Sequence, residues 1–196
     1  MAAEAAGGKV GELAPPPNGA AAWLRVEGTS VDYPVAALAD GMPDDYYLRH
    51  DLWGRESGAG CPYLMRGCGA DDPHALVYGH HMGWTGFMFS TIADTYLPAS
   101  FARIGRALWS TAGGGETAFV PYCAMRVDKA YQGIRRFDFS GGSGMEEWLN
   151  GLAADASSRS DGWRSLSASA ARALTLVTCS SVRAGMRDRT LLVFAS

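Results

Sequence analysis

Residues 174–179 read Leu-Thr-Leu-Val-Thr-Cys, an apolar and β-branched run that ends on a cysteine. Arg189 opens a second run of this kind, Thr-Leu-Leu-Val-Phe at residues 190–194. Both runs are typical of buried β-strands. If the two strands pair antiparallel around the loop of residues 180–188, Cys179 and Arg189 face each other at one rim of a sheet, with Cβ atoms about 5 Å apart.

A third apolar run, Leu-Val-Tyr-Gly-His at residues 76–80, ends on His80. A thiol, an imidazole and a guanidinium at strand ends are the parts of a nucleophilic acyl-transfer site. Cys179 would attack as a thiolate, and His80 would serve as its base or as an imidazolium that stabilises it. Arg189 stays protonated at physiological pH and would stabilise the negative charge that develops on the substrate's carbonyl oxygen.

Each of these residues also has a structural interpretation. Taken alone, a cysteine such as Cys179 is more often buried than nucleophilic, and a histidine such as His80 is more often a hydrogen-bonded surface residue. His80 and His81 together suggest a metal site, but neighbours on an extended chain point to opposite faces, so we assign no metal ligand. We expect Arg183 and Arg187 to be solvated. The functional interpretation rests on the common position of the three candidates at strand ends.

Composition narrows the class of protein. The 196 residues, 47% hydrophobic with a mean hydropathy of -0.06, suffice for one soluble domain with a sizeable core. The net charge of -3 predicts no nucleic-acid partner. We find no apolar run of membrane-spanning length and no signal-peptide pattern at the N-terminus.

The cysteine pattern argues against a cofactor or a disulfide framework. The four cysteines form no CxxC pair, which disfavours a zinc site. Cys61 and Cys68 would lie roughly 20 Å apart on an extended strand, far beyond disulfide reach. We expect these two and Cys123 to be small, half-buried apolar side chains, and we assign no cofactor.

The remaining pattern predicts a mainly β fold with peripheral helices. We expect residues 1–21 to form a loosely ordered, Pro-rich arm that is helical or irregular, and residues 22–196 to form one domain that holds the three candidate residues. A long insertion at residues 128–170 holds a helix at residues 144–152 before the penultimate strand, with Ser143 as its N-cap. Its apolar face carries Met145, Trp148, Leu149 and Leu152. Further strands are expected at residues 22–26, 31–35, 62–65, 75–78, 107–110 and 118–127, and short helices at residues 44–50, 87–92 and 98–104.

Several segments resemble the sortases, and most closely the class B sortases. Residues 23–35 resemble the family's opening strand pair, and residues 45–51 its next helical turn. Residues 77–82, Val-Tyr-Gly-His-His-Met, resemble the histidine motif. Residues 175–179 match the TLxTC signature, with Arg189 at the family's arginine position ten residues later. The likeness runs from about residue 22 to the end, and the last two motifs are the specific ones.

The resemblance implies a closed sortase-type barrel of about eight strands and a cysteine transpeptidase on the outer face of a Gram-positive cell. Such an enzyme cuts the sorting signal of a surface protein after Thr, holds the acyl part as a thioester and transfers it to an amine of the peptidoglycan precursor. His80 would be the acid and base, Cys179 the nucleophile and Arg189 the oxyanion or substrate clamp. The membrane would be reached only through an anchor outside these residues.

The resemblance also suggests where the substrate binds. The insertion would wall the substrate groove. The residues expected to contact substrate are Tyr78, Val177, Thr178, Ser180 and Ser181. Val177 stands where close relatives often carry Ser, and Ser180 and Ser181 replace residues that are often acidic. These departures affect the expected sorting motif more than the chemistry.

Three other functions remain open. A pilin-polymerising sortase would use a lysine of another pilin as the acceptor. A cysteine peptidase would hydrolyse its substrate without transfer; an L,D-transpeptidase is disfavoured because its Gly-Cys-x-Arg motif is absent. A catalytically silent binding barrel would leave Cys179 without a role.

Overall fold

Strands β8 (Ala173–Cys179) and β9 (Asp188–Ala195) form the antiparallel pair that the sequence predicts. They belong to a nine-stranded mixed sheet in the computed structural model, which describes residues 17–140, 144–183 and 186–196. The strand order is β5-β1-β2-β3-β4-β8-β9-β6-β7, and pairing of β5 with β6 closes the sheet. The expected closed barrel of about eight strands is confirmed, with β7 as an additional strand on β6.

Most of the other elements follow the predicted order with small shifts in their bounds, and two short ones, at residues 83–85 and 158–159, are not predicted by the sequence pattern. The strands are β1 Ala20–Val26, β2 Asp32–Ala36, β3 Tyr63–Leu64, β4 His74–Tyr78, β5 Ala107–Thr111, β6 Glu116–Asp128 and β7 Ser158–Arg159. The helices are the 3-10 turns η1 Tyr46–Leu48, η2 Gly83–Thr85 and η3 Ser90–Ile92, and the α-helices α1 Pro98–Phe101, α2 Gly144–Asp155 and α3 Trp163–Ser169. The first strand begins two residues before the predicted domain boundary, and residues 1–16 of the predicted arm lie outside the described residues.

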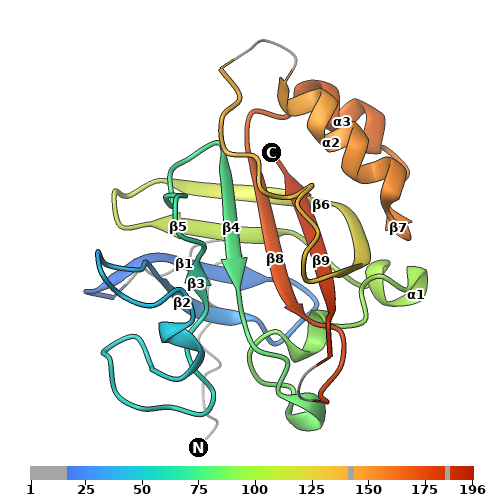
Figure 1. Cartoon of the computed structure of the whole chain (residues 1–196). Coiled ribbons are helices and arrows are strands. Elements are labelled where there is room, and N and C mark those ends of the chain that lie inside the picture. Colours follow the sequence, from blue (N-terminus) through green and yellow to red (C-terminus); the bar gives the residue numbers. More distant parts are fainter. Residues whose placement is uncertain (1–16, 141–143, 184–185) are drawn as a thin grey trace, which may run out of the picture.

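Two parallel strand pairs interrupt an otherwise antiparallel barrel. β2 pairs with β3, and β4 pairs with β8, with Tyr78 opposite Val177. Parallel neighbours end at the same edge of a sheet. Figure 1 shows the arrowheads of β4 and β8 pointing to the same end of the barrel. The residues that follow these two strands are therefore neighbours, although they are about 100 positions apart in the sequence.

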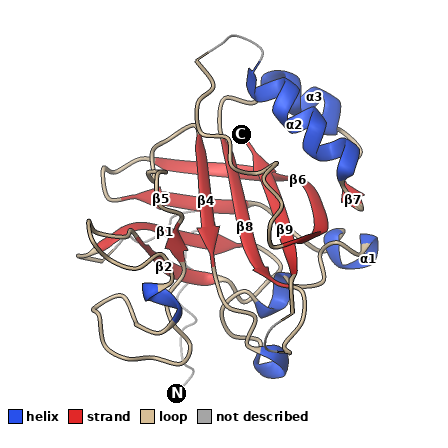
Figure 2. Cartoon of the chain, in the orientation of Figure 1, coloured by secondary structure: helices blue, strands red, loops and turns tan. Residues whose placement is uncertain are grey.

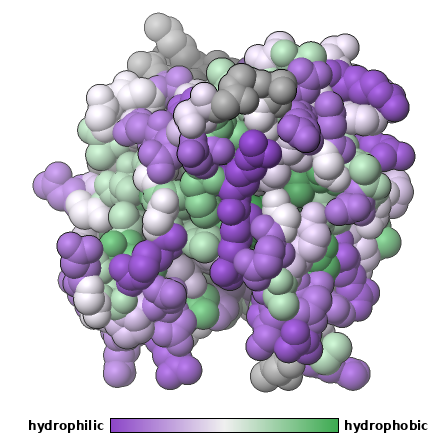
Figure 3. Space-filling model, turned by 45° about the horizontal axis from the view of Figure 1, so that its top comes forward, coloured by the Kyte–Doolittle hydropathy of each residue, from purple (hydrophilic) through white to green (hydrophobic). Residues whose placement is uncertain are grey.

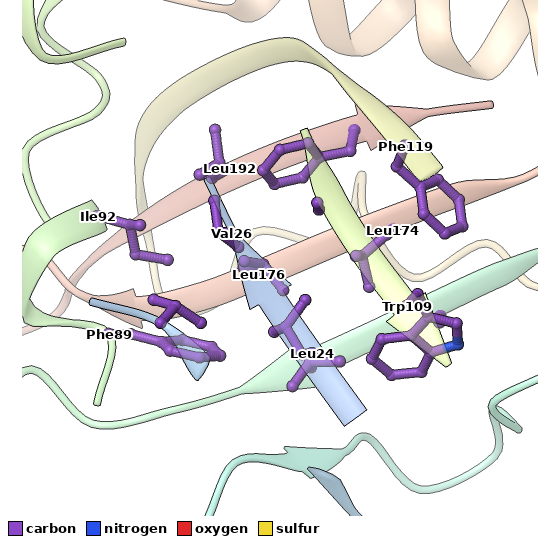
Figure 4. Close-up of a cluster of buried hydrophobic side chains, with 14 of the residues drawn as sticks. Leu24, Val26, Phe89, Ile92, Trp109, Phe119, Leu174, Leu176 and Leu192 are labelled. Atoms are coloured by element: carbon purple, nitrogen blue, oxygen red, sulfur yellow. The ribbon is translucent and has the colours of Figure 1, made fainter. Parts of the chain in front are cut away.

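Large apolar side chains from most strands fill the barrel. Leu24 of β1, Trp109 of β5 and Leu176 of β8 meet there with Phe89, which precedes η3 (Figure 4). Side chains alternate between the two faces of a strand. Because Leu174, Leu176 and Leu192 point inward, Val177, Cys179, Arg189 and Leu191 belong to the outer face of β8 and β9.

Helices α2 and α3 cover part of this outer face, at the end of the barrel away from the arrowheads of β4 and β8 (Figures 1 and 2). The predicted apolar face of α2, formed by Met145, Trp148, Leu149 and Leu152, is buried against outward residues of β4, β6, β8 and β9. α3 is not predicted by the sequence pattern. The predicted N-cap Ser143 lies outside the described residues.

The described surface is mainly hydrophilic on the face drawn in Figure 3, with smaller hydrophobic areas between polar side chains. Among the described residues, no helix is both long and apolar enough to cross a bilayer. The four cysteines are free thiols; Cys61 and Cys123 are buried and Cys68 is half-buried.

Candidate functional site

Cys179 and Arg189 lie directly opposite each other at the open end of the β8–β9 pair. The next pair along the strands, Ser180 with Asp188, is joined by a backbone hydrogen bond in which Ser180 N–H donates to the Asp188 carbonyl at 3.1 Å. Since hydrogen-bonded and non-hydrogen-bonded pairs alternate in an antiparallel ladder, Cys179 and Arg189 form a non-hydrogen-bonded pair. Side chains approach most closely at such positions, on the outer face in this case.

The parallel pairing of β4 with β8 brings His80 to the same edge. Gly79 N–H donates to the Val177 carbonyl at 3.0 Å, so the ladder continues to the residue before His80. His80, Cys179 and Arg189 line one cavity of about 200 Å³. The three candidate residues predicted from the sequence therefore converge, with a thiol, an imidazole and a guanidinium around one space.

The backbone carbonyl of Leu48 fixes the tautomer of His80. The Nε2 atom of His80 lies 2.8 Å from this carbonyl oxygen, which can only accept, so Nε2 carries the hydrogen. In the neutral ring, Nδ1 is then the basic nitrogen. When the ring is protonated, the same carbonyl accepts from a cation and helps to hold the imidazolium in place. Leu48 belongs to η1, so a turn 32 residues upstream orients the imidazole.

Close packing at Gly79 holds the backbone that carries His80. A Cβ atom added to Gly79 would lie 2.6 Å from the ring of Phe89, so the ring of Phe89 occupies the space of that missing side chain. Phe89 is fully buried in the barrel core, and its N–H donates to the His80 carbonyl at 2.9 Å. The histidine is thus anchored through both its backbone and its ring.

The start of β9 positions the guanidinium of Arg189. Nη1 donates to the carbonyls of Met186 and Asp188 at 3.0 and 3.1 Å. Within the described part of the chain, Nη2 and Nε of Arg189 make no hydrogen bond. These groups are available to an oxyanion or a substrate carbonyl.

Two exposed ion pairs tie the same segment to β6. Arg187 pairs with Asp128 through its Nε and Nη2 at 2.6 and 2.7 Å, and Asp188 pairs with Arg126. The guanidinium of Arg187 lowers the pKa of the Asp128 carboxyl. Arg187 is exposed, as predicted for a solvated residue, but it is paired with Asp128. Arg183 is exposed and forms no ion pair within the described residues.

The other three thiols are unsuited to nucleophilic attack. Burial raises the pKa of Cys61 to about 12 and also raises the pKa values of Cys68 and Cys123. A raised pKa keeps the sulfur protonated at neutral pH, and a thiol is a poor nucleophile. Cys179 is only half-buried and lines the cavity, so it is the thiol that a substrate can reach.

The residues predicted to contact substrate divide into two groups. Tyr78, Val177 and Thr178 line the cavity with the three candidate residues. Thr178 is buried, and strand alternation turns its side chain towards the barrel interior, so only its backbone can face a substrate. Ser180 and Ser181 are not among the cavity's lining residues: the Ser180 hydroxyl pairs with that of Thr190 at 2.9 Å, and the Ser181 hydroxyl accepts from Arg183 N–H at 3.2 Å.

Two further cavities adjoin the first along the outer face. One, of about 190 Å³, shares Tyr78, Val177 and Arg189 with it and is also lined by residues of the segment 127–135. The other, of about 420 Å³, shares Tyr63 and Tyr78 with it. The start of the insertion therefore walls the space beside Arg189, and helix α2 packs further along the barrel.

Sequence reasoning missed the contributions of Leu48, Tyr63 and His81. Leu48 contributes a backbone carbonyl, which no residue type reveals, and Tyr63 enters the cavity only because β3 lies beside β4. The sequence suggests His81 only as a possible metal ligand, but its Nδ1 lies 2.9 Å from the Cys179 carbonyl oxygen. In the described residues, no group of three or more His, Cys, Asp or Glu residues is placed to hold a metal ion.

Comparison with known proteins agrees with the geometry. No protein-family model matches the chain, and no curated protein matches it. Sortase B from Clostridium perfringens is 24% identical, with a TM-score of 0.74 over 90% of this chain and 93% of that one. Sortase B from Staphylococcus aureus is 20% identical, with a TM-score of 0.73 over 90% and 81%. Spy0129, a class B sortase of Streptococcus pyogenes, is 19% identical, with a TM-score of 0.71 over 91% and 92%. The resemblance noted in the sequence thus extends to the whole barrel, and the chain has the fold of the class B sortases.

Proposed function

We propose that the chain is a sortase-type cysteine transpeptidase that joins a surface protein to an amine of the cell wall. The observation that carries this proposal is the cavity in which Cys179, His80 and Arg189 meet at one edge of the barrel. The fold shared with class B sortases supports it.

Acylation would begin with the thiolate of Cys179. Its sulfur attacks the carbonyl carbon of the scissile peptide bond, and the carbonyl oxygen takes up the negative charge beside the guanidinium of Arg189. His80, protonated on Nδ1, gives that proton to the leaving nitrogen as the C–N bond breaks. The products are a thioester on Cys179, a free amine and a neutral His80.

Transfer would reverse the roles of the same groups. The acceptor amine attacks the thioester carbonyl, and Nδ1 of His80 removes a proton from the attacking nitrogen. The C–S bond breaks, the thiolate of Cys179 leaves, and a new amide bond forms. The enzyme returns to its starting state, with a thiolate and a protonated His80.

The connected cavities suit an extended peptide. Tyr78 stands where all three meet, and Val177 and Leu191 give an apolar floor beside Arg189. We propose that a sorting signal binds here and is cut after Thr, as the sequence resemblance implies. Staphylococcus aureus sortase B has been solved in complex with a substrate, and a sortase B has been solved with triglycine, which supports a peptide donor and an amine acceptor for this chain. The proposed location is the outer face of a Gram-positive cell, where such donors and acceptors occur.

Mass spectrometry of the reaction tests the proposal. The purified protein is incubated with a library of Pro-x-Thr sorting peptides, with and without triglycine. We expect a covalent adduct on Cys179 and a ligated product whose yield rises with triglycine concentration, and C179A should form neither. If no peptide in the library yields an adduct, or if C179A performs equally well, the proposal is wrong.

A pilin acceptor is a second candidate, since the structurally similar Spy0129 is described as involved in pilus biogenesis. Replacing triglycine by a pilin domain with a reactive lysine distinguishes the two acceptors. Hydrolysis that is unaffected by either amine would instead identify a cysteine peptidase.

A further inference from the structure

His81 makes a hydrogen bond that the proposed chemistry does not use. Its Nδ1 lies 2.9 Å from the backbone carbonyl oxygen of Cys179. A carbonyl oxygen can only accept, so Nδ1–H of His81 donates. The contact links the residue after the proposed base directly to the residue that carries the proposed nucleophile.

The position of this contact follows from the β4–β8 ladder. In a parallel ladder the hydrogen bonds recur every two residues, and Gly79 N–H already donates to the Val177 carbonyl. The next bond in the series would join the backbone N–H of His81 to the Cys179 carbonyl. In its place the imidazole of His81 donates to that carbonyl.

The backbone cannot make this bond because the chain has already turned away from β8. The His80 carbonyl accepts from Phe89 N–H at 2.9 Å, His81 forms an isolated bridge with Met88, and Met82 N–H donates to the Ser90 hydroxyl at 2.8 Å. These contacts tie residues 80–82 to the loop before η3.

Among the described residues, β9 offers no hydrogen-bond donor to the Cys179 carbonyl either. The bond from Ser180 N–H to the Asp188 carbonyl makes Cys179 and Arg189 a non-hydrogen-bonded pair, so the Cys179 carbonyl points away from β9. The peptide that joins Cys179 to Ser180 is therefore held on its N–H side by the bond to Asp188 and on its carbonyl side by His81. Loss of the second bond would let this peptide tilt about the first one, and the Cα–Cβ bond of Cys179 would move with it.

We propose that His81 is a positioning residue: its side chain extends the β4–β8 ladder by one bond and thereby fixes the direction of the Cys179 thiol. This inference rests on the proposed transpeptidase function. His81 acts through the carbonyl of Cys179 and takes no part in proton transfer. A shift of about 1 Å in a reacting group can cost as much as 100-fold in rate, so one such bond is enough to matter.

Three variants separate positioning from other roles. H81A removes the donor. H81N restores it, because an Asn side-chain N–H can reach the position of the imidazole Nδ1–H. S90A removes the bond to Met82 N–H and so loosens the same loop while leaving the Cys179 carbonyl bond intact. For each we would measure single-turnover acylation by a peptide that acylates the unmodified protein, the alkylation rate of Cys179 by iodoacetamide, and the melting temperature.

We expect H81A to slow acylation by about 10-fold or more with little change in the half-saturating peptide concentration, since positioning acts on the chemical step. The alkylation rate of Cys179 in H81A should stay within about twofold of that in the unmodified protein. A small reagent reacts according to the fraction of thiolate and does not depend on how the sulfur is aligned with a bound carbonyl. H81N should recover most of the lost acylation rate. The acylation rate of S90A should fall less than that of H81A.

Three results would overturn the inference while the unmodified protein remains active: an H81A variant with unchanged acylation, an H81N variant as slow as H81A, or alkylation that falls in parallel with acylation. The last two would assign His81 to proton transfer or to thiolate stabilisation. An unmodified protein that no peptide acylates would instead count against the proposed function itself.

Discussion

At the scale of single residues, the site depends on one position in an antiparallel ladder. Cys179 and Arg189 form a non-hydrogen-bonded pair, so strand pairing alone places the sulfur and the guanidinium on one face of the sheet. This part of the site follows from the sequence alone, because both residues flank a short hairpin.

We predict that R189A slows acylation by about 100- to 1,000-fold, the usual effect of removing a donor to a developing oxyanion. R189K should recover only part of the rate, since an ammonium cannot reproduce the two-pronged geometry of the guanidinium. The measurement is single-turnover acylation by a sorting peptide.

Arg183 offers a matched control, because it is exposed, lies in the loop that leads to β9 and is not among the residues that line the cavity. R183A should acylate at the rate of the unmodified protein. If R189A stays within about threefold of that rate, a far smaller loss than a missing oxyanion donor causes, Arg189 does not stabilise the transition state.

The environment of His80 could not be derived from the sequence. Its place beside Cys179 requires β4 and β8 to pair in parallel, and its tautomer depends on the carbonyl of Leu48. Strand pairing over about 100 residues has no local signal, and every residue type carries a carbonyl. Only the resemblance to a known family indicated that these segments meet.

At the scale of elements, the path of the chain after β4 depends on a glycine. Gly79 lies under the ring of Phe89, and a Cβ there would lie 2.6 Å from that ring. We predict that G79A lowers the free energy of unfolding by about 1–3 kcal/mol through overpacking, and slows acylation because His80 is displaced. Urea denaturation and the acylation assay measure the two effects.

Gly151 in α2 is the comparison, because a Cβ at that position meets nothing within 4 Å. G151A should raise the free energy of unfolding by about 0.5–1 kcal/mol, as expected for an exposed helix interior, and leave acylation unchanged. Equal stability of the two variants would show that the contact between Gly79 and Phe89 is not tight.

Helices α2 and α3 show what the pattern of one sequence can and cannot predict. α2 has apolar residues at helical spacing, and its buried face is the predicted one. α3 is short and carries Ser165, Ser167 and Ser169, so it has neither strong propensity nor a wide apolar face. It forms because Trp163 and Leu166 pack beside α2 and because the Ser167 hydroxyl donates to Asn150 Oδ1 at 2.7 Å. Such tertiary contacts lie outside any local pattern.

At the scale of the whole molecule, the insertion must stay docked on the barrel. His74 of β4 is fully buried there: its Nδ1 lies 2.9 Å from the Arg136 carbonyl and its Nε2 2.9 Å from the Thr175 hydroxyl. Its ring also lies close to those of Phe137 and Trp148. Barrel, insertion and helix α2 thus meet at one histidine.

Burial lowers the pKa of His74 from 6.5 to about 4, because the charged imidazolium is poorly solvated there. Between these two values the unfolded chain binds a proton that the folded chain does not. Stability is therefore complete above pH 6.5 and falls as the pH drops towards 4. This difference in pKa between the unfolded and the folded chain corresponds to roughly 3 kcal/mol.

We predict that this loss appears in urea denaturation curves recorded between about pH 7.5 and 4.5, and that it shrinks in H74Q, whose side chain does not titrate. H74Q should be less stable than the unmodified protein at the upper end of this range, and the difference should narrow on acidification. Carboxyls with lowered pKa, such as those of Glu27, Asp128 and Asp138, also begin to lose their contribution as the pH falls below about 5, but this loss is common to both proteins and cancels in the difference between them. A constant difference between the two proteins across the range would mean that His74 takes up its proton at the same pH in the folded and the unfolded chain, and that the insertion is open to water where it meets the barrel.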